Sequence, residues 1–196
     1  PDRGLIHLIN LWPRVLEKVP SAQLHITYPI DLVTIKAWDS SVEGYYCHEM
    51  ERLLARNDPS IHIIRYTNEQ LNEFLYSQAK VLAYTYDAPG PSELFGMIVP
   101  EALQADIRVI IPDESDALSE LWGEYVYLLP EPPMESAKHW CNVWVDTIVD
   151  ALIEEDMPEL PGLEVALYSW YNVCRRYEDV FYGLPMTFGK PTLSLE

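Results

Sequence analysis

Pro91-Ser-Glu-Leu-Phe-Gly-Met-Ile-Val-Pro-Glu-Ala102 is the stretch of this chain that decides the fold class. Its two carboxylates, Glu93 and Glu101, are separated by seven residues that include a Phe-Gly pair. An apolar run at 81–86 precedes it and indicates a strand, and a helical pattern and a second apolar run at 107–111 follow it. Strand, glycine-containing loop, helix and strand in this order are typical of a ligand site at the carboxyl ends of strands in an α/β sheet.

The same alternation of strands and helices extends outward from this stretch. We expect an α/β domain with a parallel sheet covered on both faces, formed by residues 1–182 and followed by a tail at 183–196. Pro13 should kink the first helix or make it restart, and Thr67 or Asn68 should cap the third. Apolar periodicity predicts helices at 4–19, 42–56, 67–78, 98–104, 116–121, 140–152 and 163–181, and strands at 24–27, 61–65, 81–86, 107–111 and 125–128.

Composition narrows the class of protein. The chain of 196 residues carries 31 acidic and 13 basic residues, a formal net charge of -18, which disfavours binding to nucleic acid or to an anionic membrane surface. No apolar run approaches the ~20 residues that span a bilayer. The cysteines Cys47, Cys141 and Cys174 are odd in number and widely separated, which favours reduced thiols in a cytoplasmic protein.

On spacing alone, Glu93 and Glu101 fit several kinds of chemistry. Two carboxylates can form a general acid/base pair for glycoside hydrolysis, can accept hydrogen bonds from sugar or ribose hydroxyls, or can be surface charges near a helix N-terminus. Arg3 precedes Gly4 at the start of a helix, where a cation and backbone N–H groups suit a phosphate. The histidines show no metal-ligand spacing, so we expect neither a metal nor a cofactor.

Several segments together resemble the C-terminal, nucleotide-sugar-binding domain of GT-B glycosyltransferases, specifically the retaining enzymes of glycosyltransferase family 4. Glu93-Leu-Phe-Gly with Glu101-Ala resembles the E-x7-E signature of that family. The flanking matches are the opening helix Pro1-Asp-Arg-Gly-Leu-Ile-His-Leu-Ile-Asn-Leu-Trp-Pro-Arg-Val15, the strand and helix at 61–75, and Tyr168-Ser-Trp-Tyr-Asn-Val-Cys-Arg-Arg-Tyr177. The resemblance spans nearly the whole chain and implies a Rossmann-like parallel sheet with a helical C-terminal extension.

The resemblance implies roles for individual residues. Glu93 would hold hydroxyls of the donor sugar near the reacting face, and Glu101 would accept hydrogen bonds from the ribose. Arg3 takes the place of the phosphate-binding lysine. Backbone N–H groups would approach the sugar and diphosphate at Phe95, Gly96, Met97 and Ile98. The implied chemistry is transfer of a sugar from a nucleoside diphosphate with retention, without an obligatory metal.

The chain also departs from the family pattern. Asp106 and Arg108 stand where the family usually has glycine and proline, and a strand-ending glycine is replaced around Arg65 or Tyr66. The resemblance implies that the first strand of the domain and an acceptor-binding domain would precede Pro1, so we expect weak donor binding without turnover. A non-catalytic GT-B domain that acts as an interaction module and a sugar-nucleotide epimerase-like relative are the alternative functions.

Overall fold

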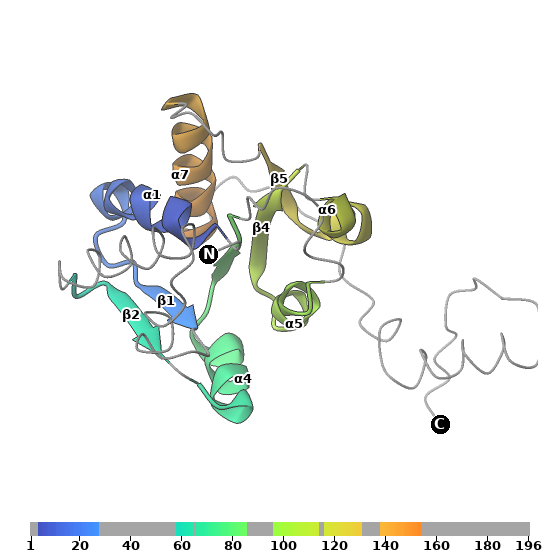
Figure 1. The fold of residues 1–196 in the computed structure, drawn as a ribbon. Coiled ribbons are helices and arrows are strands. Elements are labelled where there is room, and N and C mark those ends of the chain that lie inside the picture. The colour runs from blue at the N-terminus through green and yellow to red at the C-terminus, as the bar shows by residue number, and fades with distance from the viewer. Residues whose placement is uncertain are drawn as a thin grey trace, which may run out of the picture. The chain divides into compact units, whose positions relative to one another are not determined.

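The computed structural model describes residues 4–27, 58–64, 66–85, 96–113, 116–130 and 138–153 (Figure 1). The chain divides into two compact units, residues 1–160 and residues 161–196, and all described residues belong to the first. The predicted helices at 42–56 and 163–181 and the predicted domain boundary at 182 lie outside the described residues.

The described part of the chain is an α/β structure with small parallel sheets flanked by helices. Strands β1 (Leu24–Thr27) and β2 (Ile61–Ile64) pair in parallel and form one sheet. Strands β3 (Val81–Ala83), β4 (Arg108–Pro112) and β5 (Tyr127–Leu129) form a second parallel sheet with β4 in the middle. The predicted parallel pairing is confirmed, and the strands are divided between these two sheets.

Strands β2 and β4 lie within one residue of their predicted ends, whereas β3 and β5 differ more. Strand β3 ends at Ala83, although the backbone N–H of Tyr84 still donates to the Ile110 carbonyl at 2.9 Å. Strand β5 begins at Tyr127 because the residues before it form a 3-10 turn, Gly123–Tyr125, that extends helix α6 (Asp116–Trp122). Of residues 125–128 only Val126 is buried, so the apolar character of this run does not mark where the strand begins.

Helix α1 (Leu5–Lys18) follows from its apolar stripe. Leu8, Leu11, Trp12 and Val15 recur at helical spacing and are all buried. Pro13 lies within the helix and is exposed, and α1 runs through it as one element, so the helix does not restart there. Proline removes one N–H from the helix, and burial of the opposite face offsets that loss.

Helix α4 (Asn68–Ser77) has the N-cap that the sequence predicts. The Thr67 hydroxyl accepts a hydrogen bond from the Gln70 N–H at 3.3 Å, and the Gln70 side chain accepts one from the Thr67 N–H at 3.0 Å. This reciprocal capping box satisfies two backbone donors that the first turn leaves unpaired.

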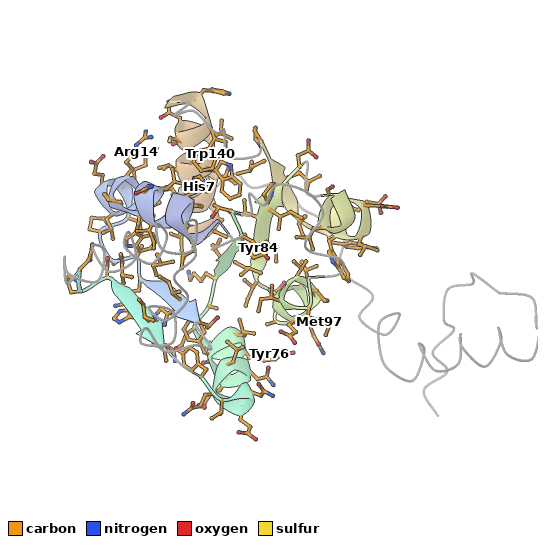
Figure 2. All side chains as sticks on the ribbon, in the orientation of Figure 1. His7, Arg14, Tyr76, Tyr84, Met97 and Trp140 are labelled. Atoms are coloured by element: carbon orange, nitrogen blue, oxygen red, sulfur yellow. The ribbon has the colours of Figure 1, made fainter. Side chains whose placement is uncertain are left out.

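The core lies where α1 meets helix α7 (Lys138–Ile153). Trp140 and Trp144 of α7 both donate their indole N–H to the Pro130 carbonyl, at 2.8 and 2.9 Å, which fixes the helix against the end of β5. Figure 2 shows His7 of α1 beside Trp140, and their rings meet edge to face with centroids 5.8 Å apart. Among the described helices, none is both long enough and apolar enough to cross a bilayer.

Candidate functional site

The described part of the predicted site begins at Gly96, where the chain enters helix α5 (Ile98–Gln104). Gly96, Met97, Ile98 and Glu101 are described, whereas Arg3, Glu93 and Phe95 lie outside the described residues. The structure therefore bears on the helix N-terminus of the predicted site and not on the first carboxylate.

Gly96 occupies a position that only glycine fits. Its φ of 62° lies in the left-handed region, and the residue is buried. A Cβ at this position would overlap the Leu118 Cδ2 atom of α6, and Leu118 is 0% exposed. The Gly96 carbonyl accepts a hydrogen bond from the Val99 N–H at 2.8 Å, which turns the chain into α5. The glycine thus brings the backbone close to the neighbouring helix and sets the direction in which α5 starts.

The start of α5 lies against helix α6. Helix α5 is followed after a short turn by β4, and the two elements pack against each other. The residue that meets Gly96, Leu118, belongs to α6, which follows β4. Backbone N–H groups in the first turn of a helix have no partner within the helix, and they attract anions.

The start of α1 lies beside the carboxyl end of strand β3. Thr85, two residues after β3, donates its hydroxyl to the Gly4 carbonyl at 2.6 Å, and its side chain is 1% exposed. Gly4 caps α1 in the left-handed conformation with φ 65°. The start of α1 therefore lies at the carboxyl end of β3, which pairs in parallel with β4.

The remaining predicted contacts are arranged along α5. Met97, which is labelled in Figure 2, lies at the helix start and is 60% exposed, and Ile98 is half-buried. Glu101 is exposed in the first turn, and its N–H donates to the Met97 carbonyl at 3.3 Å. The apolar face formed by Val99 and Ala102 is fully buried, which leaves the Glu101 side of the helix to solvent.

Two of the three departures from the resembled family pattern, Asp106 and Arg108, follow the C-terminal end of α5, and Arg65 of the third lies outside the described residues. Asp106 follows the helix with φ 57°, the left-handed conformation that favours the glycine usual in the family. The Arg108 guanidinium donates to the Ala151 carbonyl at 3.3 Å, near the C-terminal end of α7. Since seven helical residues rise about 10 Å, both substitutions are remote from the start of α5.

An aromatic cluster on the other sheet was not recognised as a unit in the sequence. His25 of β1 lies directly opposite His62 of β2, with ring centroids 4.9 Å apart. His25 also stacks on Phe74 of α4 at 4.5 Å, and its Nδ1 atom lies 3.3 Å from the Tyr66 hydroxyl. The only sign of it in the sequence is a histidine at the second position of each of the two predicted strands, 24–27 and 61–65.

Burial controls the charge of this cluster. Desolvation lowers the pKa of His25, and the neighbouring His62 lowers it further. The His62 Nε2 atom is buried and has no hydrogen-bond partner among the described residues. Burial therefore favours the neutral imidazole of His25.

The described residues include no group of three or more His, Cys, Asp or Glu side chains able to hold a metal ion. The described part of the predicted site presents the backbone at the start of α5, the exposed Glu101 carboxylate and the close approach of Gly96 to Leu118. Comparison of the chain with protein-family models and with curated proteins found no match to either.

Proposed function

We propose that this chain is the donor-binding domain of a retaining glycosyltransferase, with a Rossmann-like GT-B fold, which transfers a sugar from a nucleoside diphosphate. The observation that carries the proposal is the left-handed, buried Gly96 at the start of α5, which brings the backbone against Leu118 of α6. The E-x7-E stretch around that glycine supplies the chemical class, because carboxylates hold sugar hydroxyls and helix N-termini hold phosphates.

The proposed donor lies across the start of α5. Its diphosphate would accept hydrogen bonds from the backbone at Gly96, Met97 and Ile98, and Arg3 would add a positive charge. Glu101, one turn into the helix, would accept hydrogen bonds from both ribose hydroxyls. The exposure of Glu101 and the burial of the opposite helix face support this orientation.

The proposed reaction needs a stabilised leaving group. Cleavage of the bond between the sugar and the diphosphate builds negative charge on the phosphate oxygens, and donors fixed in advance near that charge lower the barrier. Glu93 would orient the sugar through its hydroxyls so that the acceptor approaches one face. The acceptor would be held by a separate domain, and turnover is proposed only for a protein that includes it.

Calorimetric titration with UDP, GDP and ADP sugars tests the proposal. We expect one of these donors to bind, and Glu101→Ala to weaken its binding at least about tenfold through loss of the ribose contacts. Glu73→Ala, which removes an exposed carboxylate from α4, is the matched control and should bind as the parent does. Absence of binding to every nucleotide sugar would refute the proposal and favour a non-catalytic interaction module.

A further inference from the structure

Strand β5 carries an exposed leucine on the face of its sheet opposite to α1 and α7. Tyr127 and Leu129 pack on the cluster formed by α1 and α7, and because side chains alternate along a strand, Leu128 points to the other face. On that face Leu128 lies beside Ile111 of β4, its partner in the parallel register. Ile111 is 0% exposed and Leu128 is 36% exposed, so burial on this face falls from β4 to β5.

Helix α6 adds a second exposed leucine close to the first. Leu118 and Trp122 are 0% exposed and α6 packs on β4, which fixes the helix on the sheet. Gly123 follows the helix, and a Cβ at that position would lie 3.3 Å from the Leu128 Cδ1 atom. Leu121 precedes Gly123 by two residues and is 38% exposed. Leu121 and Leu128 therefore border the same turn at the end of α6.

Two carboxylates flank Leu121 along the chain. Glu120 and Glu124 are both exposed, one in α6 and the other in the 3-10 turn that extends it. The sequence from 109 to 137, which includes both, holds seven acidic residues and no Lys, Arg or His. A molecule that approaches the end of α6 therefore meets a negative potential beside two exposed leucines.

We propose that Leu121, Leu128, Glu120 and Glu124 form a docking surface, here called the α6–β5 surface, for a basic amphipathic helix of a partner protein. Apolar side chains of that helix cover the two leucines, and its Lys or Arg side chains pair with the two glutamates. Glu120 and Glu124 are four residues apart, so cations spaced by about one helical turn in the partner reach both.

Charge complementarity selects this partner among the candidates. A second copy of the chain carries the same net charge of -18 and would be repelled, as would nucleic acid or an anionic membrane. Exposed ion pairs contribute little affinity each, so the leucines supply the contact area and the glutamates the selectivity. The inference stands independently of the proposed function, because none of the four residues belongs to the proposed donor site.

The test titrates the complete chain with a labelled peptide of about 18 residues that carries leucines at helical spacing and lysines on both flanks. Fluorescence anisotropy should show binding at least about fivefold tighter than that of a peptide with the same composition in scrambled order. Replacing both Glu120 and Glu124 by glutamine should weaken binding about fivefold at low salt, and less at high salt. The matched control replaces Glu69 and Glu73, two exposed glutamates of α4 that are also four residues apart, and should bind within about twofold of the parent.

A second measurement on the parent chain locates the peptide without any substitution. Saturable changes in amide chemical shift should occur at Leu121, Gly123 and Leu128, while the amide shifts of Glu73 and Tyr76 in α4 stay constant. Leu121→Gln should weaken peptide binding about fivefold or more, because it removes an apolar contact and keeps a good helix former.

Absence of saturable binding of the amphipathic peptide overturns the proposal. Equal loss of binding in the α4 and α6 double variants also overturns it, because the attraction would then come from the overall charge of the chain. Chemical-shift changes in the parent that leave out the α6–β5 surface have the same consequence. A parent that is dimeric by analytical ultracentrifugation, and that Leu121→Gln converts to a monomer, overturns it as well, because a second copy then occupies this surface.

Discussion

Gly96→Ala is expected to destabilise the protein by about 2–4 kcal/mol. A residue other than glycine costs about 1–2 kcal/mol in the left-handed conformation that Gly96 adopts. The added Cβ overlaps Leu118 Cδ2, and overpacking a closed core costs about 1–3 kcal/mol. Leu118 is fully buried, so its side chain cannot swing into solvent to relieve the overlap. Lower entropy of the unfolded chain offsets about 0.4–1 kcal/mol of the total.

A double-mutant cycle separates the cost of the left-handed backbone at residue 96 from the cost of the overlap with Leu118. Leu118→Ala alone should cost about 2–5 kcal/mol, because it leaves a cavity under α6. In the double variant the overlap disappears and the backbone strain remains. Its loss of unfolding free energy should therefore be smaller than the sum of the two single-variant losses by about 1–3 kcal/mol. Urea unfolding of the four proteins, followed by tryptophan fluorescence and circular dichroism, measures these differences.

Gly123→Ala is the matched control for this cycle. A Cβ at Gly123 would lie 3.3 Å from the Leu128 side chain, and Leu128 is 36% exposed, so it can move away. We expect Gly123→Ala to lower the free energy of unfolding by less than about 1 kcal/mol. A Gly96→Ala protein within about 0.5 kcal/mol of the parent, or strictly additive losses in the cycle, would refute the geometry assigned to the start of α5.

Three further predictions concern other parts of the structure. Asp106→Gly should raise the free energy of unfolding by about 0.5–1 kcal/mol, measured by urea unfolding, since it relieves a left-handed backbone. Because the pKa of His25 is lowered in the folded state, the unfolded chain binds more protons, and stability should fall as pH drops through about 6.5 and below; His25→Asn should flatten this dependence in unfolding curves recorded from pH 5 to 8. Trp144→Phe should lower stability by about 1–3 kcal/mol in thermal unfolding, since it removes a hydrogen bond to the Pro130 carbonyl and part of a fully buried side chain.

Each of these predictions has a contradictory result. An Asp106→Gly protein less stable than the parent would show that the aspartate is favourable at that turn. A parent whose stability rises as pH falls from 6.5 to 5 would contradict the desolvation assigned to His25, because the folded state would then bind the additional proton. A Trp144→Phe protein as stable as the parent would show that the shared carbonyl contributes nothing to the packing of α7.

Local pattern was enough to predict most elements of the described fold. Helix α7 has a strong apolar stripe, and α4 has a complete capping box, so both were predicted to within a few residues. The 3-10 turn before β5 was missed because an apolar run such as 125–128 can belong to a strand or to the end of a helical segment, and periodicity does not distinguish the two over so few residues. That α1 continues through Pro13 as one helix could not be predicted, because burial of the other helix face depends on α7, which is remote in sequence.

Predicting the candidate site required more than periodicity. The glycine at 96 and the helix after it were visible in the sequence, but the left-handed backbone and the contact with Leu118 depend on how α6 packs. The pairing of His25 with His62 depends on strand register between segments separated by more than thirty residues, which single-residue patterns do not encode. Positions of Asp106 and Arg108 at the far end of α5 likewise follow from the helix direction.

Backbone amide chemical shifts recorded during titration with a nucleoside diphosphate sugar test the central claim most directly. Donor binding at the start of α5 should change the amide chemical shifts of Gly96, Met97 and Ile98 in a saturable manner. The amide chemical shifts of Asp106 and Ile107, beyond the opposite end of the helix, should stay constant. Shifts confined to Asp106 and Ile107, or no saturable shift with any UDP, GDP or ADP sugar, would contradict the account.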